Sequence, residues 1–169
     1  MSVSLLPRMM AGKLTDLTAD MLHDIGTKLL MLDFDNTIVP YTTDIAAPEV
    51  LDWLERMKAS DIQLCVVSNS HKERVREFCA RHGIDCITHA RKPFSKGICE
   101  CLNRYEIAAQ YCALVGDQIF TDTLGANGCG VKSILVKAID NHNFWLKARH
   151  VLELPFVFTA KHRRKTLKI

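Results

Sequence analysis

The sequence has no long hydrophobic run, no internal repeat and no linker rich in glycine, serine or proline. Its uncharged apolar stretches, such as Ile62–Ser70, are far shorter than the ~20 residues that a membrane-spanning helix needs. Composition is even up to the last nine residues, which predicts a single domain over residues 1–160 and a tail over residues 161–169. The 48% hydrophobic and 24% charged residues exclude a disordered or low-complexity chain.

The cysteines also lack the spacings that would give them a structural role. The seven cysteines contain no C-x-x-C pair, and the seven histidines show no metal-ligand spacing with them. A zinc site is therefore disfavoured. An odd number of cysteines in apolar segments is typical of buried free thiols in a reducing compartment. Because Met1–Gly12 lacks the apolar core of a signal peptide, we expect a cytoplasmic protein.

Negative charge is missing from the tail, which carries five lysines and arginines and no acid. The whole chain has a net charge of +3, so the first 160 residues sum to −2. A slightly acidic domain is not expected to bind nucleic acid, since such proteins spread basic side chains over one face. The tail is either a solvated terminus or a peripheral contact to an anionic membrane surface.

What the chain does contain is a regular alternation of short apolar runs and helical patterns. Strands are predicted at Leu29–Phe34, Ile62–Val67, Cys86–Thr88, Tyr111–Val115 and Val131–Val136. Helices are predicted from Pro48 to about Ser60, over His71–Arg81 with Ser70 as N-cap and Gly83 as stop, from Ser95 onward, over Phe120–Asn127 and over Asn143–Leu152. This order predicts an α/β fold, a three-layer Rossmann-like arrangement around a central parallel sheet of about five strands.

Acidic side chains follow two of the predicted strands. Asp33 and Asp35 lie at the end of the first strand, and Asp117 follows the fourth, with Asp122 five residues on. In parallel sheets these ends meet at one edge, where ligands bind. Asp33 and Asp35 alone are equally well explained as turn residues. The four acids together predict a Mg²⁺ site, because the cation relieves the repulsion between carboxylates.

Groups suited to phosphate follow the other strands. Ser68-Asn69-Ser70 places hydroxyl, amide and backbone N–H groups at a helix start, which favours phosphate binding. Lys92 lies in a loop near the same edge, where its charge would offset repulsion between the acids and a phosphate. These groups together predict phosphoryl transfer, in which Asp33 attacks phosphorus and Asp35 acts as acid and base.

The motifs, taken in order, resemble those of the haloacid dehalogenase (HAD) superfamily of phosphatases. The matching segments are Asp33-x-Asp35-x-Thr37, Ser68 after an apolar strand, Lys92, and Gly116-Asp117-x-x-x-x-Asp122. More narrowly, the chain resembles the YqeG-type phosphatases of subfamily IIIA from about Leu6 to Glu153. That likeness also uses Glu73-Arg74-Val75 and Arg91-Lys92-Pro93, and it departs from the pattern at Ser70 and at Ala138.

The resemblance implies a role for each of these residues. It implies that Asp33 is the nucleophile and Asp35 the acid and base, with phosphate held by Ser68, Asn69 and Lys92. Lys96 is the alternative to Lys92 as the phosphate lysine. The resemblance further implies that Mg²⁺ is bound by the Asp33 side chain, the Asp35 backbone carbonyl and Asp117, with support from Thr37, Gly116 and Asp122.

The gaps between motifs bear on the substrate. Neither Thr37 to Pro48 nor Ser70 to Lys92 is long enough for a cap domain, so we expect an open site. Open sites suit bulky phosphate esters, and the resemblance implies phosphatidylglycerophosphate, a lipid. The alternatives are a phosphatase of a soluble nucleotide or sugar phosphate, and a weakly active phosphate-binding regulatory protein.

Overall fold

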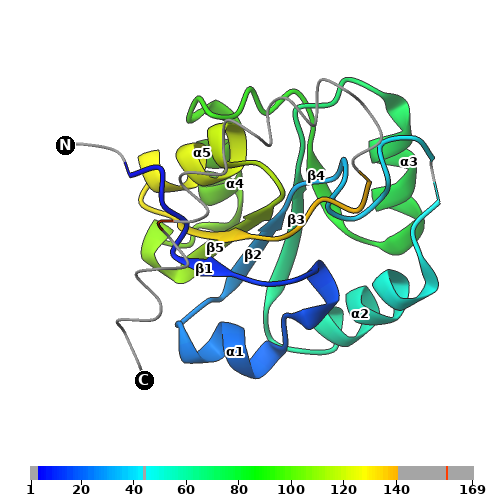
Figure 1. The fold of residues 1–169 in the computed structure, drawn as a ribbon, viewed down its shortest axis with the longest axis horizontal. Helices are drawn as coiled ribbons and strands as arrows, with labels where there is room; N and C mark the ends of the chain where they lie inside the picture. The colour runs from blue at the N-terminus through cyan, green and yellow to red at the C-terminus, as the bar shows by residue number, and fades with distance from the viewer. Residues whose placement is uncertain (1–3, 44, 141–158, 160–169) are drawn as a thin grey trace.

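The structure is a computed structural model that describes residues 4–43, 45–140 and 159. Six parallel strands form one sheet in the order β1-β6-β5-β2-β3-β4, which confirms the α/β class with one strand more than expected (Figure 1). The strands are β1 (Met9–Met10), β2 (Leu29–Leu32), β3 (Gln63–Val67), β4 (Asp85–Ile87), β5 (Cys112–Gly116) and β6 (Lys132–Leu135). The missed strand, β1, is two residues long and, among the described strands, pairs with β6 alone, so it leaves no alternating pattern in the sequence.

The described helices are α1 (Ala19–Asp24), α2 (Pro48–Lys58), α3 (Glu73–His82), α4 (Lys96–Tyr105) and α5 (Leu124–Gly128). Four of the five described helices follow the predicted order, and α1 was not predicted, because its six residues are too few to show a helical period. Two 3₁₀ turns, η1 (Leu14–Asp16) and η2 (Ala109–Tyr111), and a π-helix, η3 (Ile119–Thr123), complete the described elements. The predicted helix over Asn143–Leu152 and the basic tail lie outside the described residues.

One predicted helix start is wrong. α3 begins at Glu73 after Lys72, and Ser70 is not its N-cap. The Ser70 hydroxyl instead accepts a hydrogen bond from the Lys72 N–H at 3.2 Å, which forms a local turn before the helix. Gly83 ends the helix as predicted, with a φ of 60° that favours glycine.

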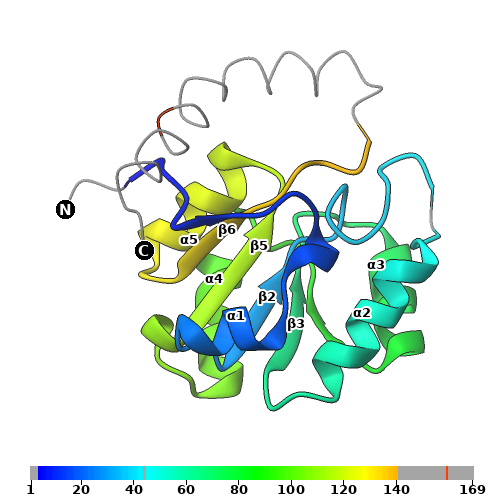
Figure 2. The same ribbon diagram turned by 60° about the horizontal axis from the view of Figure 1, so that its bottom comes forward.

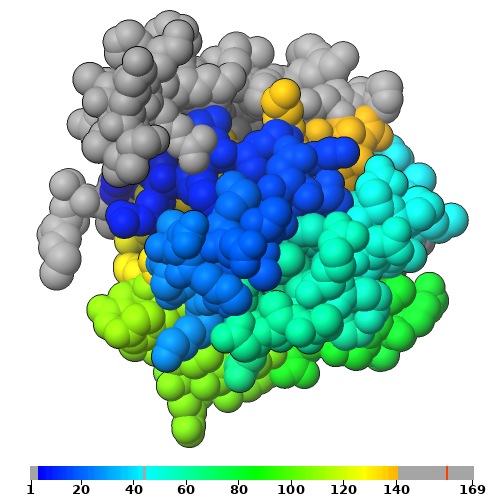
Figure 3. All heavy atoms as spheres, turned by 90° about the horizontal axis from the view of Figure 1, so that it is seen from below, coloured from blue at the N-terminus to red at the C-terminus, as the bar shows by residue number. Residues whose placement is uncertain are grey.

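The sheet is buried on both faces. In β2 every side chain is buried, with Leu30 and Leu32 packed in the cluster that contains α1, α2 and α3. Leu29 and Met31 point into the cluster of α4 and α5. Figure 3 shows the blue atoms of α1 next to the cyan-green atoms of α2 on one side of the molecule. Among the described residues, no helix is long and apolar enough to cross a bilayer.

The order of the strands reverses between β2 and β5. The chain moves from β2 to β3 and β4 on one side, and from β5 to β6 on the other. Leu32 is in register with Val115, and the Asp33 N–H donates to the Val115 carbonyl at 2.8 Å. The loops that follow β2 and β5 therefore begin side by side at the point where α/β proteins bind ligands. Figure 2 shows these strands running toward one edge of the sheet.

The segment before β2 is attached to the core through Trp53 of α2. The Trp53 ring is buried, and its Nε1–H donates to the Leu17 carbonyl at 2.6 Å. Leu17 and Leu22 are buried in the same cluster, so this hydrogen bond ties η1 and α1 to α2. The hydrogen bond between the buried indole N–H and the carbonyl is important for stability, because either group buried without a partner costs the free energy of its desolvation.

We expect Trp53→Phe to destabilise the protein by about 1–3 kcal/mol, because the Leu17 carbonyl loses its donor and the smaller ring leaves space. Thermal unfolding should show a melting temperature lower by about 3–10 °C. The control is Tyr111→Phe, an aromatic exchange at an exposed position, which should change the melting temperature by about 1 °C or less. Equal melting temperatures for Trp53→Phe and the parent would contradict the assigned role of this bond.

Candidate active site

Three carboxylates from two segments meet at the carboxyl edge of the sheet. Asp33 follows β2, Asp117 follows β5, and Asp122 comes from the π-helix η3. One oxygen from each of the three lies within 4.8 Å of the others, a spacing that could hold a metal ion. The predicted convergence of acids is therefore present for these three side chains.

Lys92 lies within this carboxylate cluster. Its Nζ is 2.6 Å from Asp33 Oδ1 and 2.7 Å from Asp122 Oδ1, and the Lys92 side chain is 1% exposed. Lys96 is exposed at the first position of α4. Of the two candidate lysines, the structure places Lys92 beside the carboxylates.

The cluster carries more negative than positive groups. Burial raises the pKa of Asp33 to about 7, and the nearby Asp122 adds to this while Lys92 opposes it. Burial, followed by the charge of Asp33, also raises the pKa of Asp117 well above its ordinary value. For Lys92, burial alone would lower the pKa, but Asp122 and Asp33 together raise it, so this ammonium stays charged. One cation thus faces three acids, and a further positive charge would stabilise their ionised forms.

The donor set fits a divalent cation. Asp117 Oδ1 is buried and has no hydrogen-bond partner among the described residues. A buried oxygen of this kind is costly unless a donor or a cation satisfies it. Carboxylate oxygens are the ligands that Mg²⁺ prefers, usually one or two of them together with water. Asp33 and Asp117 are accordingly the side chains that would hold it.

Gly116 allows Asp122 to approach the end of β5. A Cβ atom on Gly116 would lie 2.3 Å from Asp122 Cγ, so any larger residue would displace the carboxylate. Asp122 Oδ2 also accepts a hydrogen bond from the Gln118 N–H at 3.2 Å, which orients it toward Lys92. The π-helix η3 supplies this geometry, in keeping with the frequent occurrence of π-bulges at functional sites.

Asp35 is not one of the three clustered acids, and its partner is Arg74. The Arg74 guanidinium forms an ion pair with Asp35 Oδ1 and donates to the Thr43 carbonyl at 2.8 Å. It also lies over the Phe34 ring, with 5.5 Å from Cζ to the centroid. The sequence singled out Arg74 only as part of a family motif. Its contact with Asp35 depends on where α3 packs, which no local pattern specifies.

The turn after β2 carries Thr37 into the interior. Asn36 adopts a φ of 62°, which Asn tolerates better than most residues, and its Oδ1 accepts from the Tyr41 N–H at 2.9 Å. Thr37 is 2% exposed, and its hydroxyl has no hydrogen-bond partner within the described part of the chain. This places Thr37 at the base of the loop that begins with Asp33 and Asp35, as a supporting residue would be.

The polar side chains that follow β3, Ser68 and Asn69, make different kinds of contact. Ser68 is 1% exposed, and its Oγ accepts from the Ser70 N–H at 3.0 Å, which leaves its own O–H able to donate. The Asn69 amide is taken up by the backbone of Lys92, with Oδ1 2.7 Å from the Lys92 nitrogen and Nδ2 2.9 Å from its carbonyl oxygen. The Asn69 side chain thus holds the Lys92 loop, and a direct contact of Asn69 with phosphate remains a prediction.

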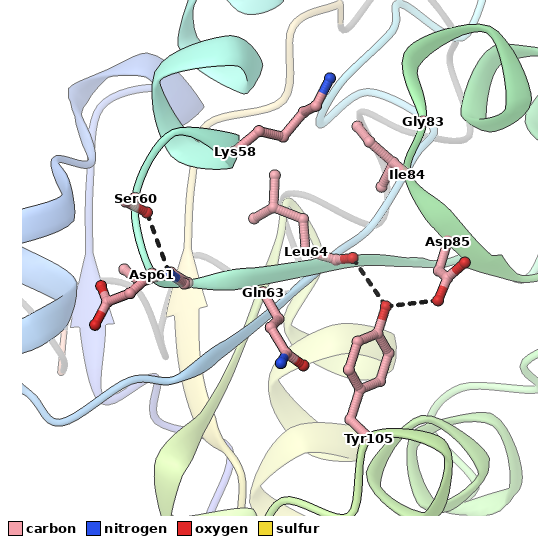
Figure 4. A pocket seen from close by; sticks show the side chains of 10 residues that line it. Lys58, Ser60, Asp61, Gln63, Leu64, Gly83, Ile84, Asp85 and Tyr105 are labelled. Atoms are coloured by element: carbon pink, nitrogen blue, oxygen red, sulfur yellow. Dashed lines mark hydrogen bonds between the residues drawn. The ribbon is translucent and has the colours of Figure 1, made fainter.

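A hollow of about 470 Å³ lies at the other edge of the sheet, where β3 and β4 begin (Figure 4). The Tyr105 hydroxyl there is 3.1 Å from the Leu64 carbonyl oxygen and 2.9 Å from Asp85 Oδ2. Burial raises the pKa of Tyr105, so the phenol stays protonated. None of the clustered carboxylates lines this hollow, and the chemistry of the two places is separate.

Comparisons with known proteins agree with this geometry. A family model described as "Mitochondrial PGP phosphatase" matches residues 2–139. The "Probable phosphatase YqeG" of Bacillus subtilis is 34% identical over 131 residues, which are 78% of this chain and 76% of that protein.

Solved structures share the fold at lower identity. The cobalt-bound deoxy-D-mannose-octulosonate 8-phosphate phosphatase of Haemophilus influenzae is 15% identical with a TM-score of 0.54, over 76% of this chain and 89% of that one. The D,D-heptose 1,7-bisphosphate phosphatase of B. bronchiseptica, complexed with magnesium and phosphate, is 19% identical with a TM-score of 0.54, over 66% and 82% of the two chains. The matched family model and the YqeG relative, with which the shared fold agrees, show that this chain belongs to the PGP phosphatase family and is a hydrolase of phosphoric monoesters.

Proposed function

We propose that this phosphatase uses Mg²⁺ and an aspartyl-phosphate on Asp33, and that its substrate is a bulky phosphate ester, phosphatidylglycerophosphate in the first instance. The observation that carries the proposal is the position of Asp33. Its buried carboxylate lies 2.6 Å from the Lys92 ammonium and in reach of Asp117. A nucleophile needs this combination of a fixed carboxylate and nearby positive charge when the other reactant is an anion.

The residues divide the reaction between them. Asp33 attacks phosphorus, the bond from phosphorus to the ester oxygen breaks, and Asp35 gives a proton to the leaving oxygen. Asp35 then takes a proton from water, which attacks the phosphorus of the aspartyl-phosphate, releases phosphate and restores Asp33. Lys92 and the Ser68 hydroxyl bind phosphate oxygens. When Mg²⁺ is bound by Asp33 and Asp117, it neutralises charge on the transferred group.

Arg74 orients the acid and base in this scheme. Because its guanidinium holds one oxygen of Asp35, the other oxygen is directed to the proton that moves. Arg74 itself is anchored by the Thr43 carbonyl, so the loop after β2 and the start of α3 fix the position of Asp35 together.

The open surroundings of the site support a bulky substrate. In the described chain, β2 is joined to α2 by a loop and β3 to β4 by α3, with no inserted domain. The phosphate of a large ester can therefore reach Asp33 while the rest of the substrate stays outside. The matched family model is described as a PGP phosphatase, which supports the same substrate.

Asp33→Asn should lower the rate of hydrolysis of an aryl phosphate by about a thousandfold or more, because a carboxamide keeps the size of the side chain but cannot attack phosphorus. Release of the phenol in the presence of Mg²⁺ measures this. The matched control is Asp24→Asn, at an exposed acid on α1, which should retain the parent rate. An Asp33→Asn variant as active as its parent would contradict the assignment of Asp33 as the nucleophile.

Mg²⁺ binding should depend on pH. Carboxylates must be ionised to bind the cation, and the raised pKa of Asp33, about 7, means that affinity is present above pH 7 and is lost as the pH falls through 7. The Mg²⁺ concentration that raises the melting temperature halfway should increase about tenfold from pH 8 to pH 6.

Asp117→Asn tests the same site without reference to turnover. It should require about tenfold more Mg²⁺, or show no thermal response to Mg²⁺ at all. An unchanged Mg²⁺ titration in this variant would remove Asp117 from the metal ligands.

The substrate is tested by comparing phosphate release from phosphatidylglycerophosphate in detergent micelles with release from sugar phosphates and nucleotides. The lipid should give a kcat/KM about tenfold or more above the water-soluble esters, because binding of its non-reacting part contributes to the transition state. A sugar phosphate or nucleotide that is preferred over the lipid would overturn the substrate assignment and leave the roles of Asp33 and Asp117 intact.

A further inference from the structure

Large apolar side chains are exposed around the carboxyl edge of the sheet. Among the described residues, four such side chains lie in the loops that follow the strands: Tyr41 (47% exposed), Ile45 (79%), Phe94 (73%) and Ile139 (47%). We call these four residues the apolar rim. The other exposed large apolar side chains of the described chain are Met21 on α1 and Tyr111 in the turn before β5, away from this edge.

Contacts between the loops hold the apolar rim in place. The Ile139 N–H donates to the Asn36 carbonyl at 3.0 Å, which joins the segment after β6 to the turn after β2. The Phe94 N–H donates to the Arg91 carbonyl at 2.8 Å, which closes a turn next to Lys92. In Figure 2 the loop after β2, in cyan, and the segment after β6, in orange, stand at the same edge of the molecule. The apolar rim therefore lies in the loops at the edge of the sheet that also carries the carboxylate cluster.

Positive charge accompanies the apolar rim. Lys72, Arg91 and Lys137 are exposed in the loops after β3, β4 and β6, and Lys72 Nζ lies 5.3 Å from the centroid of the Tyr41 ring. The described acids in these loops are less exposed than these three basic side chains, because each acid is buried or half-buried. They are Asp33, Asp35, Asp117 and Asp140.

Two exposed acids stand just outside the loops. They are Glu49 and Glu73, in the first turns of α2 and α3, and Glu73 is 3.4 Å from Arg76. The described residues of these loops thus present more exposed basic than acidic side chains to solvent.

We propose that the apolar rim, with Lys72, Arg91 and Lys137, docks the protein on an anionic lipid bilayer with the carboxylate cluster facing the lipid headgroups. This rests on the lipid substrate of the proposed function. Apolar side chains among lysines and arginines are the combination that binds a membrane interface, since the rings and aliphatic chains enter the acyl boundary while the cations meet lipid phosphates. A capless site would in this way be covered by the surface that holds its substrate.

Vesicle sedimentation tests the docking. The parent should sediment with vesicles of phosphatidylcholine containing one third phosphatidylglycerol, should bind phosphatidylcholine alone far less, and should be released by salt. The double variant Ile45→Ser with Phe94→Ser should bind the anionic vesicles about tenfold more weakly, because it removes the two most exposed members of the apolar rim. The matched control is Met21→Ser with Tyr111→Ser, which should bind as the parent does.

Three further measurements decide between occupants. The Ile45/Phe94 double variant should keep the parent's melting temperature and its rate on an aryl phosphate, which would support docking by exposed side chains. A lowered melting temperature would show that these side chains pack within the protein, and a parent that is dimeric by light scattering while the variant is monomeric would assign the surface to a second copy. Either result would overturn the proposal.

Failure of the docking is distinguishable from failure of the substrate assignment. Hydrolysis of phosphatidylglycerophosphate in detergent micelles by a parent that does not bind anionic vesicles would overturn the docking and leave the substrate standing. A parent that binds the vesicles but prefers sugar phosphates would overturn the substrate assignment and leave the docking standing.

Discussion

The buried ammonium of Lys92 between two carboxylates is the contact on which the site depends. Removing three acids and a lysine from water is costly, and it is sustained only because Lys92 lies 2.6 Å from Asp33 and 2.7 Å from Asp122. These two contacts leave Asp117 Oδ1 buried and without a hydrogen-bond partner among the described residues, so the cluster as a whole favours one more cation. A buried cluster with excess negative charge of this kind is suited to binding a cation.

The fold supplies this contact through strand order. Because β2 pairs with β5, Asp33 and Asp117 leave the sheet side by side although 84 positions separate them in the chain. Lys92 approaches from a third loop, and Asn69 holds its backbone on both sides through one amide. Rigid strands thus fix the carboxylates, and a side-chain clamp fixes the lysine that balances them.

Much of this architecture was predictable from local pattern. Apolar runs such as Leu29–Phe34 and Ile62–Val67 correspond to β2 and β3, since a strand covered on both faces must be apolar throughout. Pro48 marks the start of α2 and Gly83 the end of α3, because their backbone restrictions act within one turn. The failures were equally local in origin: two-residue β1 and six-residue α1 are too short to show a period, and Ser70 bonds the Lys72 amide in a turn instead of capping α3.

By itself the sequence determined which chemical groups follow which strands, and hence that acids, hydroxyls and a lysine would share one edge. Only the tertiary structure decided that Lys92 and not Lys96 lies beside the carboxylates, that Arg74 pairs with Asp35, and that the Asn69 amide holds the Lys92 loop. These choices join residues that are 23 to 59 positions apart. Their outcome depends on how helices and loops pack around the sheet, and side-chain packing of that kind leaves no periodic signal in the chain.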